Sequence, residues 1–353
     1  MADKPDPTSS HTAAALDRMQ IGNEAARLAR RNRHAIGIDL GGTQLRVACV
    51  DGGGRILALE RVRSDDVEGR DALIQQMAML VQRVRSRQVE AIGVGIPGSI
   101  NRREGLVLGI PAFPGWSGVP LAGLLQNRVQ LPVYLENDAN VAALGEWRSG
   151  AGMGSSDVAY VTISTGIGAG IISDGRLVRG FGGLAGEIGH TRLTDNSPPC
   201  SCGQIGCFEA VASGKALDRK VADAVAQNPS SILAQLAAGQ APRAEHLAEA
   251  VRRADPRAQD ILDEEAVLLG IGFTNLQHLY SPERIVVGGG VSALLPLMRE
   301  TIERIMKDRL LAGFTPAQLR VAELGDSAGV IGAAGLALDA VSDDAGDPVT
   351  RKE

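Results

Sequence analysis

The sequence has few aromatic residues and no long apolar run. Aromatic side chains make up 3% of the 353 residues, whereas hydrophobic residues make up 44%, so the cores must consist mainly of Val, Ile, Leu and Ala. This aliphatic composition indicates an α/β protein. A chain of this length can form two domains, each with a substantial core of its own.

Basic residues are not in excess either. The formal net charge of -5 argues against a nucleic acid partner or an anionic membrane surface. The first ten residues, MADKPDPTSS, are polar and lack the apolar core of a signal peptide, and no later run reaches the length of a membrane span. We therefore expect a cytoplasmic, reduced protein that binds neither nucleic acid nor membrane.

One loop, GEIGHTRLTDNSPPCSCGQIGCFE over residues 186–209, contains three of the four cysteines and a histidine. These four residues are His190, Cys200, Cys202 and Cys207. Three thiolates and one imidazole fill the tetrahedral shell of a structural zinc ion. The alternative is a disulfide or inert thiols, but clustered cysteines in a chain without an export signal more often bind metal. The same loop carries Glu187 and Glu209, which a zinc site of this kind does not need, so we expect a polar ligand beside it.

A strand, a glycine turn, a second strand and an Asp-Gly turn occur twice, over residues 35–62 and 158–178. This repetition predicts an internal duplication with two facing α/β lobes. Between the repeats we expect a helix near 71–86, strands near 90–97 and 133–138, and a helix from 140. After the loop we expect helices over 215–280, a final strand over 284–292, helices over 294–309 and a closing helix.

The predicted domains follow from this pattern. Residues 1–33 form a partly disordered extension with one basic helix. Residues 34–137 and 326–341 form a small lobe, and residues 138–325 form a large lobe with the zinc loop at 190–207. The acidic tail, residues 342–353, has the composition of a disordered segment.

The glycine turns are candidate nucleotide-binding elements. The first turn contains Gly41, Gly42 and Thr43. Its backbone N–H groups suit a polyphosphate, and Asp39, at the end of the preceding strand, is placed to hold magnesium through water. Residues 164–168, with Thr165 and Gly166, form a second hairpin for the same phosphates, and residues 288–290, including Gly289, suit a base and ribose. Each turn alone is more often a simple β-turn, and neither a Walker nor a Rossmann motif is present.

Asp138, in the segment LENDAN, is the candidate general base. It lies where a strand gives way to a helix, and phosphoryl transfer to an alcohol needs a carboxylate that accepts the hydroxyl proton. The alternative is a helix N-cap, for which Asp is also favoured. Asn137 offers the donor and the acceptor that sugar hydroxyls require. With Glu187, His190 and Glu209, these residues resemble a polyol site.

The complete set of motifs resembles the ROK family (repressors, open reading frames, kinases) over about residues 35–340. The motifs are IGIDLGGTQLR, GVGIPGSI, LENDANVAALGEW, STGIGAGIISDGRLVRGFGGLAGEIGH, CSCGQIGCFEAVASG and IVVGGGVS. The resemblance implies a two-lobed actin-like or hexokinase-like ATPase fold of the ribonuclease H type, with a small zinc-binding loop. It also implies a sugar kinase that uses ATP and Mg²⁺ to phosphorylate a hexose hydroxyl, usually the 6-OH of glucose or of an N-acetylhexosamine.

The resemblance assigns roles to particular residues. Asp138 is the catalytic base. The sugar-binding residues are Gly98, Asn137, Asp138, Glu187, His190 and Glu209. The residues for Mg²⁺ and ATP are Asp39, Gly41, Gly42, Thr43, Thr165, Gly166 and Gly289. The structural zinc ligands are His190, Cys200, Cys202 and Cys207.

Two alternatives and one departure accompany the resemblance. The family includes sugar-responsive repressors with a preceding helix-turn-helix domain, whereas the lead here has room for about one helix. A polyphosphate-dependent glucokinase is the other alternative. Ala112 stands where many relatives have Asn, so the identity of the sugar stays open. By analogy with the family, a homodimer is the expected assembly.

Overall fold

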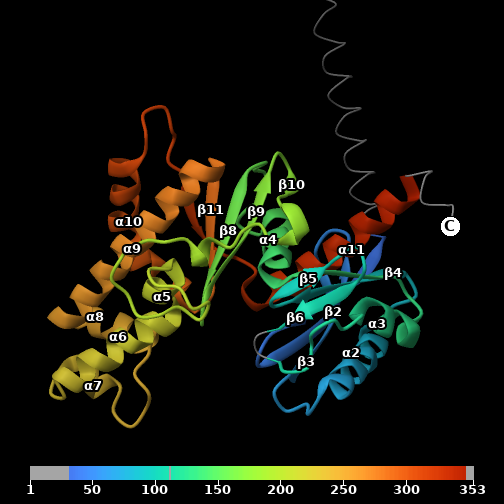
Figure 1. The fold of residues 1–353 in the computed structure, drawn as a ribbon, viewed down its shortest axis with the longest axis horizontal. Coiled ribbons are helices and arrows are strands. Elements are labelled where there is room, and N and C mark those ends of the chain that lie inside the picture. Colours follow the sequence, from blue (N-terminus) through green and yellow to red (C-terminus); the bar gives the residue numbers. More distant parts are fainter. Residues whose placement is uncertain (1–31, 111–112, 347–353) are drawn as a thin grey trace, which may run out of the picture.

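The structure is a computed structural model that describes residues 32–110 and 113–346. The predicted basic helix, nearly all of the N-terminal extension and Ala112 lie outside the described residues. Within the described part, two five-stranded sheets lie side by side, each with its own helices (Figure 1).

The first sheet has the strand order β3-β2-β1-β4-β7. Its strands are β1 (His34–Leu40), β2 (Gln44–Asp51), β3 (Ile56–Arg63), β4 (Val89–Ile96) and β7 (Val133–Asn137). Alternate residues of β1 enter two different apolar clusters, as the two-residue period of a strand requires. One cluster includes α2 (Arg70–Val84) and α3 (Leu121–Val129), and the other includes α11 (Ala328–Gly346), so helices cover both faces.

The second sheet has the order β10-β9-β8-β11-β12 and repeats the topology of the first. Its strands are β8 (Val158–Ile163), β9 (Ile167–Ser173), β10 (Arg176–Leu177), β11 (Arg284–Gly288) and β12 (Gln318–Val321). In both sheets, two antiparallel pairings are followed by two parallel ones. This shared order confirms the predicted repeat. The prediction that 284–292 is the final strand was wrong, because β12 follows and pairs with β11.

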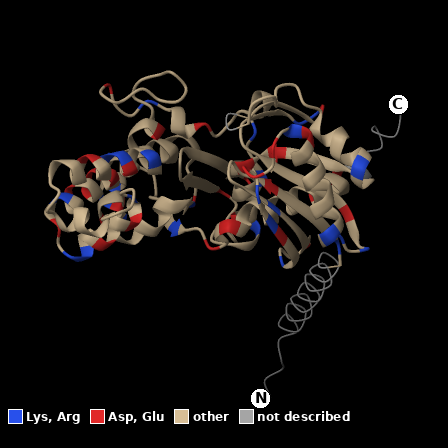
Figure 2. Ribbon diagram, turned by 90° about the horizontal axis from the view of Figure 1, so that it is seen from below, with Lys and Arg blue, Asp and Glu red and all other residues tan. Residues whose placement is uncertain are grey.

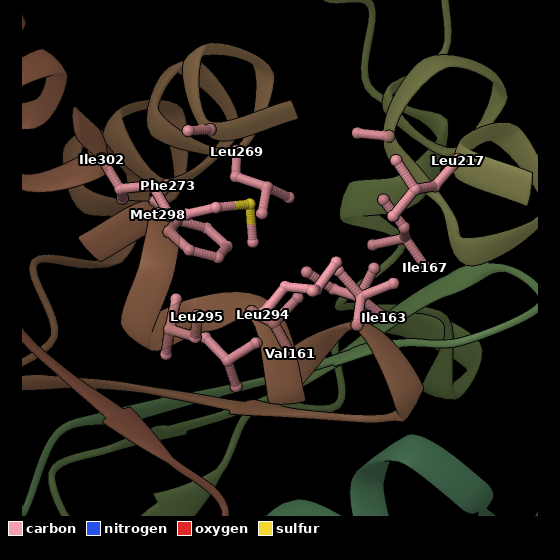
Figure 3. Packing of buried hydrophobic residues seen from close by; sticks show 14 of the residues in the cluster. Val161, Ile163, Ile167, Leu217, Leu269, Phe273, Leu294, Leu295, Met298 and Ile302 are labelled. Atoms are coloured by element: carbon pink, nitrogen blue, oxygen red, sulfur yellow. The ribbon is translucent and has the colours of Figure 1, made fainter. Parts of the chain in front are cut away.

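The helical region after the loop consists of separate helices. They are α5 (Phe208–Ala212), α6 (Gly214–Gln227), α7 (Ile232–Leu236), α8 (Ala244–Arg252), α9 (Pro256–Tyr280) and α10 (Leu295–Arg309). The side chain of Asp255 caps α9 by accepting hydrogen bonds from the N–H groups of Arg257 and Ala258. Side chains from α9, α10, β8 and β9 interlock in the core of this half (Figure 3).

Short elements complete the chain. These are the hairpin strands β5 (Ser99–Asn101) and β6 (Leu106–Gly109), and the 3-10 turns η1 (Phe181–Gly183), η2 (Ile188–His190), η3 (Gly290–Leu294) and η4 (Gly325–Ser327). Acidic and basic residues are interspersed along the ribbon of both halves (Figure 2). Among the described helices, none combines the length and the apolarity needed to cross a bilayer.

Two helices, α4 (Asp138–Ser149) and α11, lie between the sheets and pack closely against each other (Figure 1). A Cβ atom on Gly332 of α11 would lie 1.6 Å from the carbonyl oxygen of Val141 in α4, so only glycine allows this approach. Helix α11 continues to Gly346, which corrects the prediction that the disordered tail begins at residue 342. The remainder of that tail lies outside the described residues.

Candidate active site

Asp138 is the first residue of α4, directly after the buried strand β7. The N-cap of α4 is Asn137, whose side-chain oxygen accepts hydrogen bonds from the N–H groups of Ala139 at 2.9 Å and Asn140 at 3.3 Å. The alternative interpretation of Asp138 as the N-cap was therefore wrong. Its carboxylate accepts one hydrogen bond from the N–H of Ala139 at 2.9 Å and is not needed to begin the helix.

The environment of Asp138 favours the protonated carboxyl group. Burial raises its pKa, and the negative charge of Glu187 acts in the same direction, although the hydrogen bond from the Ala139 N–H opposes both. A carboxylate with a raised pKa is a better proton acceptor in general base catalysis. Glu187, predicted to bind the sugar, thus lies near enough to act electrostatically on the predicted base.

Gly98 and Asn137 meet at the carboxyl ends of β4 and β7, two parallel neighbours. The side-chain nitrogen of Asn137 lies 3.5 Å from the carbonyl oxygen of Gly98, and Gly98 has a φ of 98°, which favours glycine. Because the Asn137 oxygen already caps α4, its side chain has less capacity left for a ligand than the sequence indicated.

The first glycine turn joins β1 to β2. The N–H of Gly41 donates to the carbonyl oxygen of Gln44 at 2.8 Å, and the hydroxyl of Ser64 donates to the carbonyl oxygen of Gly41 at 2.8 Å. These bonds fix the turn, while Gly42 and Thr43 are exposed at its tip. Their N–H groups and the hydroxyl are therefore available to a phosphate.

Asp39 lies beside this turn. Burial raises its pKa to about 6, Arg46 acts in the opposite direction, and the charge of Asp138 raises it further. The two carboxylates are thus close enough to interact, although Asp39 lies in strand β1 and Asp138 begins helix α4. Arg46 contacts Asp39 at 3.3 Å and Asp326 of η4 at 3.1 Å, so it binds the turn to the segment before α11. The sequence did not single out Arg46.

The second glycine hairpin joins β8 to β9 and contacts Glu209. One carboxylate oxygen of Glu209 accepts from the N–H of Ile167 at 3.0 Å, and a Cβ atom on Gly166 would lie 2.4 Å from that oxygen. Thr165 is exposed beside it. Gly289, after β11, approaches the end of β8 so closely that a Cβ atom would lie 2.3 Å from the carbonyl oxygen of Ile163.

The loop before α5 brings its four predicted metal ligands together. Their ligand atoms all lie within 4.8 Å of one another, and the residues are His190, Cys200, Cys202 and Cys207. The Cys202 and Cys207 sulfur atoms are 3.6 Å apart, and all four cysteines of the chain are free thiols. The donor set and its convergence fit a closed tetrahedral zinc site.

The same loop carries the polar groups predicted for a sugar. Nδ1 of His190 faces the Cys200 sulfur at 3.6 Å, and Nε2 lies 4.0 Å from a carboxylate oxygen of Glu187. The Ser201 hydroxyl donates to Glu209 at 2.9 Å. Glu187 and His190 are exposed, so they are accessible to a ligand. The cluster of His190 and the three cysteines is thus directly connected to the polar groups.

Sequence reasoning also missed Glu136, the residue before Asn137. It is fully buried and pairs with Arg102 and Arg179. Burial lowers the pKa of Arg102 and so does neighbouring Arg179, whereas Glu136 opposes this change. The available signal was the one charged residue within the strand VYLEN.

Comparison with known proteins agrees with this arrangement. The chain is 35% identical to a glucokinase of Thermotoga maritima, over 85% of this chain and 96% of the relative. Among solved structures, it resembles a ROK family glucokinase from Streptomyces griseus in complex with glucose and AMPPNP. The TM-score is 0.75 at 37% identity, over 87% of this chain and 99% of the other.

A xylose repressor of Caldicellulosiruptor bescii is 31% identical over 84% of this chain and 76% of the repressor. The model of the ROK family matches residues 35–340, and the mixed α/β architecture is consistent with the actin-like ATPase fold. The chain therefore belongs to the ROK family.

Proposed function

We propose that this protein is an ATP-dependent hexose kinase in which Asp138 accepts the proton of the sugar hydroxyl, the 6-OH, as that oxygen attacks phosphorus. The observation that carries the proposal is the position of Asp138. It is a partly buried carboxylate with a raised pKa, close to Asp39 of the phosphate turn and to Glu187 of the sugar loop. The similarity to a glucokinase solved with glucose and a nucleotide analogue supports the same assignment.

In this proposal, the sugar would contact residues at the carboxyl ends of β4 and β7 and residues of the segment from Glu187 to α5. The residues that contact it are Gly98, Asn137, Asp138, Glu187, His190 and Glu209. Carboxylates accept hydrogen bonds from sugar hydroxyls, and the amide of Asn137 supplies a donor. Fixed polar groups of this kind orient one hydroxyl toward Asp138, which raises the rate by avoiding reorganisation during transfer.

In this proposal the two glycine hairpins would hold ATP, and Asp39 would hold Mg²⁺. The residues that bind them are Asp39, Gly41, Gly42, Thr43, Thr165, Gly166 and Gly289. The exposed tips of both turns and the partly buried carboxylate of Asp39 fit a polyphosphate with its metal ion. When bound, Mg²⁺ and ATP supply the phosphoryl group and the charge that offsets the phosphate oxygens.

A structural zinc ion completes the proposal. His190 and the three cysteines of the loop would bind it, and the ion would hold the loop in one conformation. Because Glu187 approaches His190 and Ser201 donates to Glu209, ordering the loop also orders the sugar-binding groups.

The test is a coupled assay of ADP release with a panel of hexoses and N-acetylhexosamines, with ATP and polyphosphate compared as donors. We expect Asp138→Asn to lower kcat by about two to four orders of magnitude, the usual contribution of a general base. Its Kd for the sugar should stay nearly unchanged. Turnover by the variant at the wild-type rate would remove Asp138 from the mechanism.

The regulator alternative rests on the similarity to the xylose repressor. It predicts DNA binding that a sugar weakens and no sugar phosphorylation. A mobility-shift assay beside the kinase assay separates the two functions. The predicted homodimer is tested by light scattering of the same preparation.

A further inference from the structure

Glu136 lies where three segments around the proposed sugar site meet. It is the penultimate residue of β7 and its side chain is fully buried. A buried carboxylate is costly unless other groups pair with it, so its partners indicate its role.

One carboxylate oxygen, Oε1, fixes the start of α4. It accepts hydrogen bonds from the backbone N–H of Asn137 at 3.1 Å and from the side-chain nitrogen of Asn140 at 3.1 Å. Asn137 in turn caps the helix that begins with Asp138. Glu136 therefore acts on the position of the proposed base through its immediate neighbours.

The other oxygen, Oε2, contacts two arginines from different parts of the fold. Nε of Arg102 lies 3.0 Å away, and Arg102 belongs to the turn of the β5–β6 hairpin that follows Gly98. Nε of Arg179 donates to the same oxygen at 2.7 Å. Arg102 from the β5–β6 turn and Arg179 from the segment after β10 therefore meet at one carboxylate oxygen.

Arg179 is the first residue of the segment that leads to Glu187. The N–H of Ala185 donates to the carbonyl oxygen of Arg179 at 3.0 Å, which closes the glycine-rich loop between them at its base. The loop itself is exposed, with Phe181 projecting fully into solvent. The bond between Arg179 and Glu136 therefore anchors the base of a loop that is otherwise largely exposed.

We propose that Glu136 is a positioning residue that holds the Gly98 hairpin and the Glu187 loop in register with Asp138, through Arg102 and Arg179. This inference rests on the proposed function, because it takes Gly98 and Glu187 as sugar-binding residues. Glu136 itself is fully buried and touches no substrate. Its loss should weaken sugar binding and leave nucleotide binding intact, because within the described residues its hydrogen bonds and ion pairs reach neither glycine hairpin.

Glu146, a buried carboxylate in α4, serves as a comparison, because its hydrogen bonds have a purely structural role. Within the part of the chain that the structure describes, its oxygens accept only backbone N–H groups, from Ala151, Glu323 and Leu324. None of these residues belongs to a segment predicted to bind sugar. Glu136 differs because its partners include two arginines whose segments carry predicted sugar ligands.

The experiment compares Arg179→Gln and Glu136→Gln with the wild type by calorimetric titration with glucose and, separately, with a non-hydrolysable ATP analogue. We expect the Kd for glucose to rise at least tenfold in both variants, or about 1.4 kcal/mol. The nucleotide Kd should stay within twofold. In turnover, KM for the sugar should rise more than kcat falls.

The matched control is Arg33→Gln. Arg33 pairs with Glu90 at 2.7 Å and is 34% exposed, against 2.7 Å and 30% for Arg179. Its partner lies at the start of β4, away from the proposed sugar contacts. We expect this variant to bind glucose as the wild type does.

Three results would overturn the role of Glu136. The first is an unchanged glucose Kd in folded Arg179→Gln, which decides the matter even where Glu136→Gln does not fold. The second is an equal loss of glucose and nucleotide affinity, and the third is the same loss in Arg33→Gln. If the wild type phosphorylates no hexose in the sugar panel, the proposed function fails and this inference with it. Normal binding by wild type and variants alike overturns only this inference.

Discussion

Phe208→Ala tests how the loop of residues 190–207, with its histidine and three cysteines, is anchored to the core. Phe208 follows Cys207 and precedes Glu209, and it is among the largest fully buried side chains. Its ring lies against α9, where a Cβ atom on Gly272 would come within 2.4 Å of the ring. Its N–H donates to the carbonyl oxygen of Thr191 at 2.9 Å. Phe208 thus joins the loop to helix α9.

The expected loss of stability follows from this burial. An aromatic side chain buries roughly 150–250 Å². At about 25 cal/mol per Å² this is an upper bound of about 4–6 kcal/mol, and removal of a core Phe typically costs about 3–5 kcal/mol. With a urea m-value of about 3 kcal/mol/M, the unfolding midpoint should fall by at least about 1 M. Urea titration followed by circular dichroism measures this shift.

Phe181→Ala is the matched control, because the same substitution is made at a fully exposed ring in η1. It should change the free energy of unfolding by no more than about 0.5 kcal/mol. A loss below about 1 kcal/mol in Phe208→Ala, or equal losses in both variants, would refute the reasoning from burial. The metal content of Phe208→Ala should also fall, because Cys207 lies next to the residue removed.

Three further predictions concern the loop, a buried acid and the helix crossing. Chelation of zinc, or Cys202→Ser, should raise the Kd for sugar more than that for nucleotide; equal affinity of apoprotein and holoprotein for sugar would contradict this coupling. Burial raises the pKa of Glu265 to about 7. Its protonated form therefore favours folding below about pH 4.5, and this contribution is lost as pH rises through 7. Glu265→Gln should gain about 3 kcal/mol over the wild type at pH 8 and almost nothing at pH 4, which urea titration at both pH values checks. Gly332→Ala should lower the free energy of unfolding by about 1–3 kcal/mol or more, because its Cβ would meet the Val141 carbonyl. Gly123→Ala, in a helix with open space, should instead raise it by about 0.5–1 kcal/mol, and the same denaturation measurement compares the two.

The parts predictable from sequence were those encoded by local pattern. The strand, glycine turn and strand units gave β1 and β2, and again β8 and β9, because alternation and turn glycines are local signals. The convergence of the histidine and the three cysteines also followed from the sequence, since all four residues lie within one loop. In contrast, β12 has only four residues with mixed exposure, and its pairing with β11 depends on a distant segment.

Ion pairs between residues far apart in the sequence could not be predicted from local pattern. Arg46 contacts Asp326, 280 positions later, and Arg179 contacts Glu136 across 43 positions. Neither pair has a periodicity or motif that links its members. The alternative that Asp138 caps α4 also lay one residue too late, because Asn and Asp are both favoured at that position and stand side by side.

The close crossing of α4 and α11 has a consequence for movement. At Gly332 the backbone of α11 lies directly on the carbonyl group of Val141 in α4, with no side chain of residue 332 between them. We expect the crossing to serve as a pivot, about which small rotations become larger displacements at the distant rims of the two sheets. A molecule built this way can open to exchange ligands while its interior remains solid.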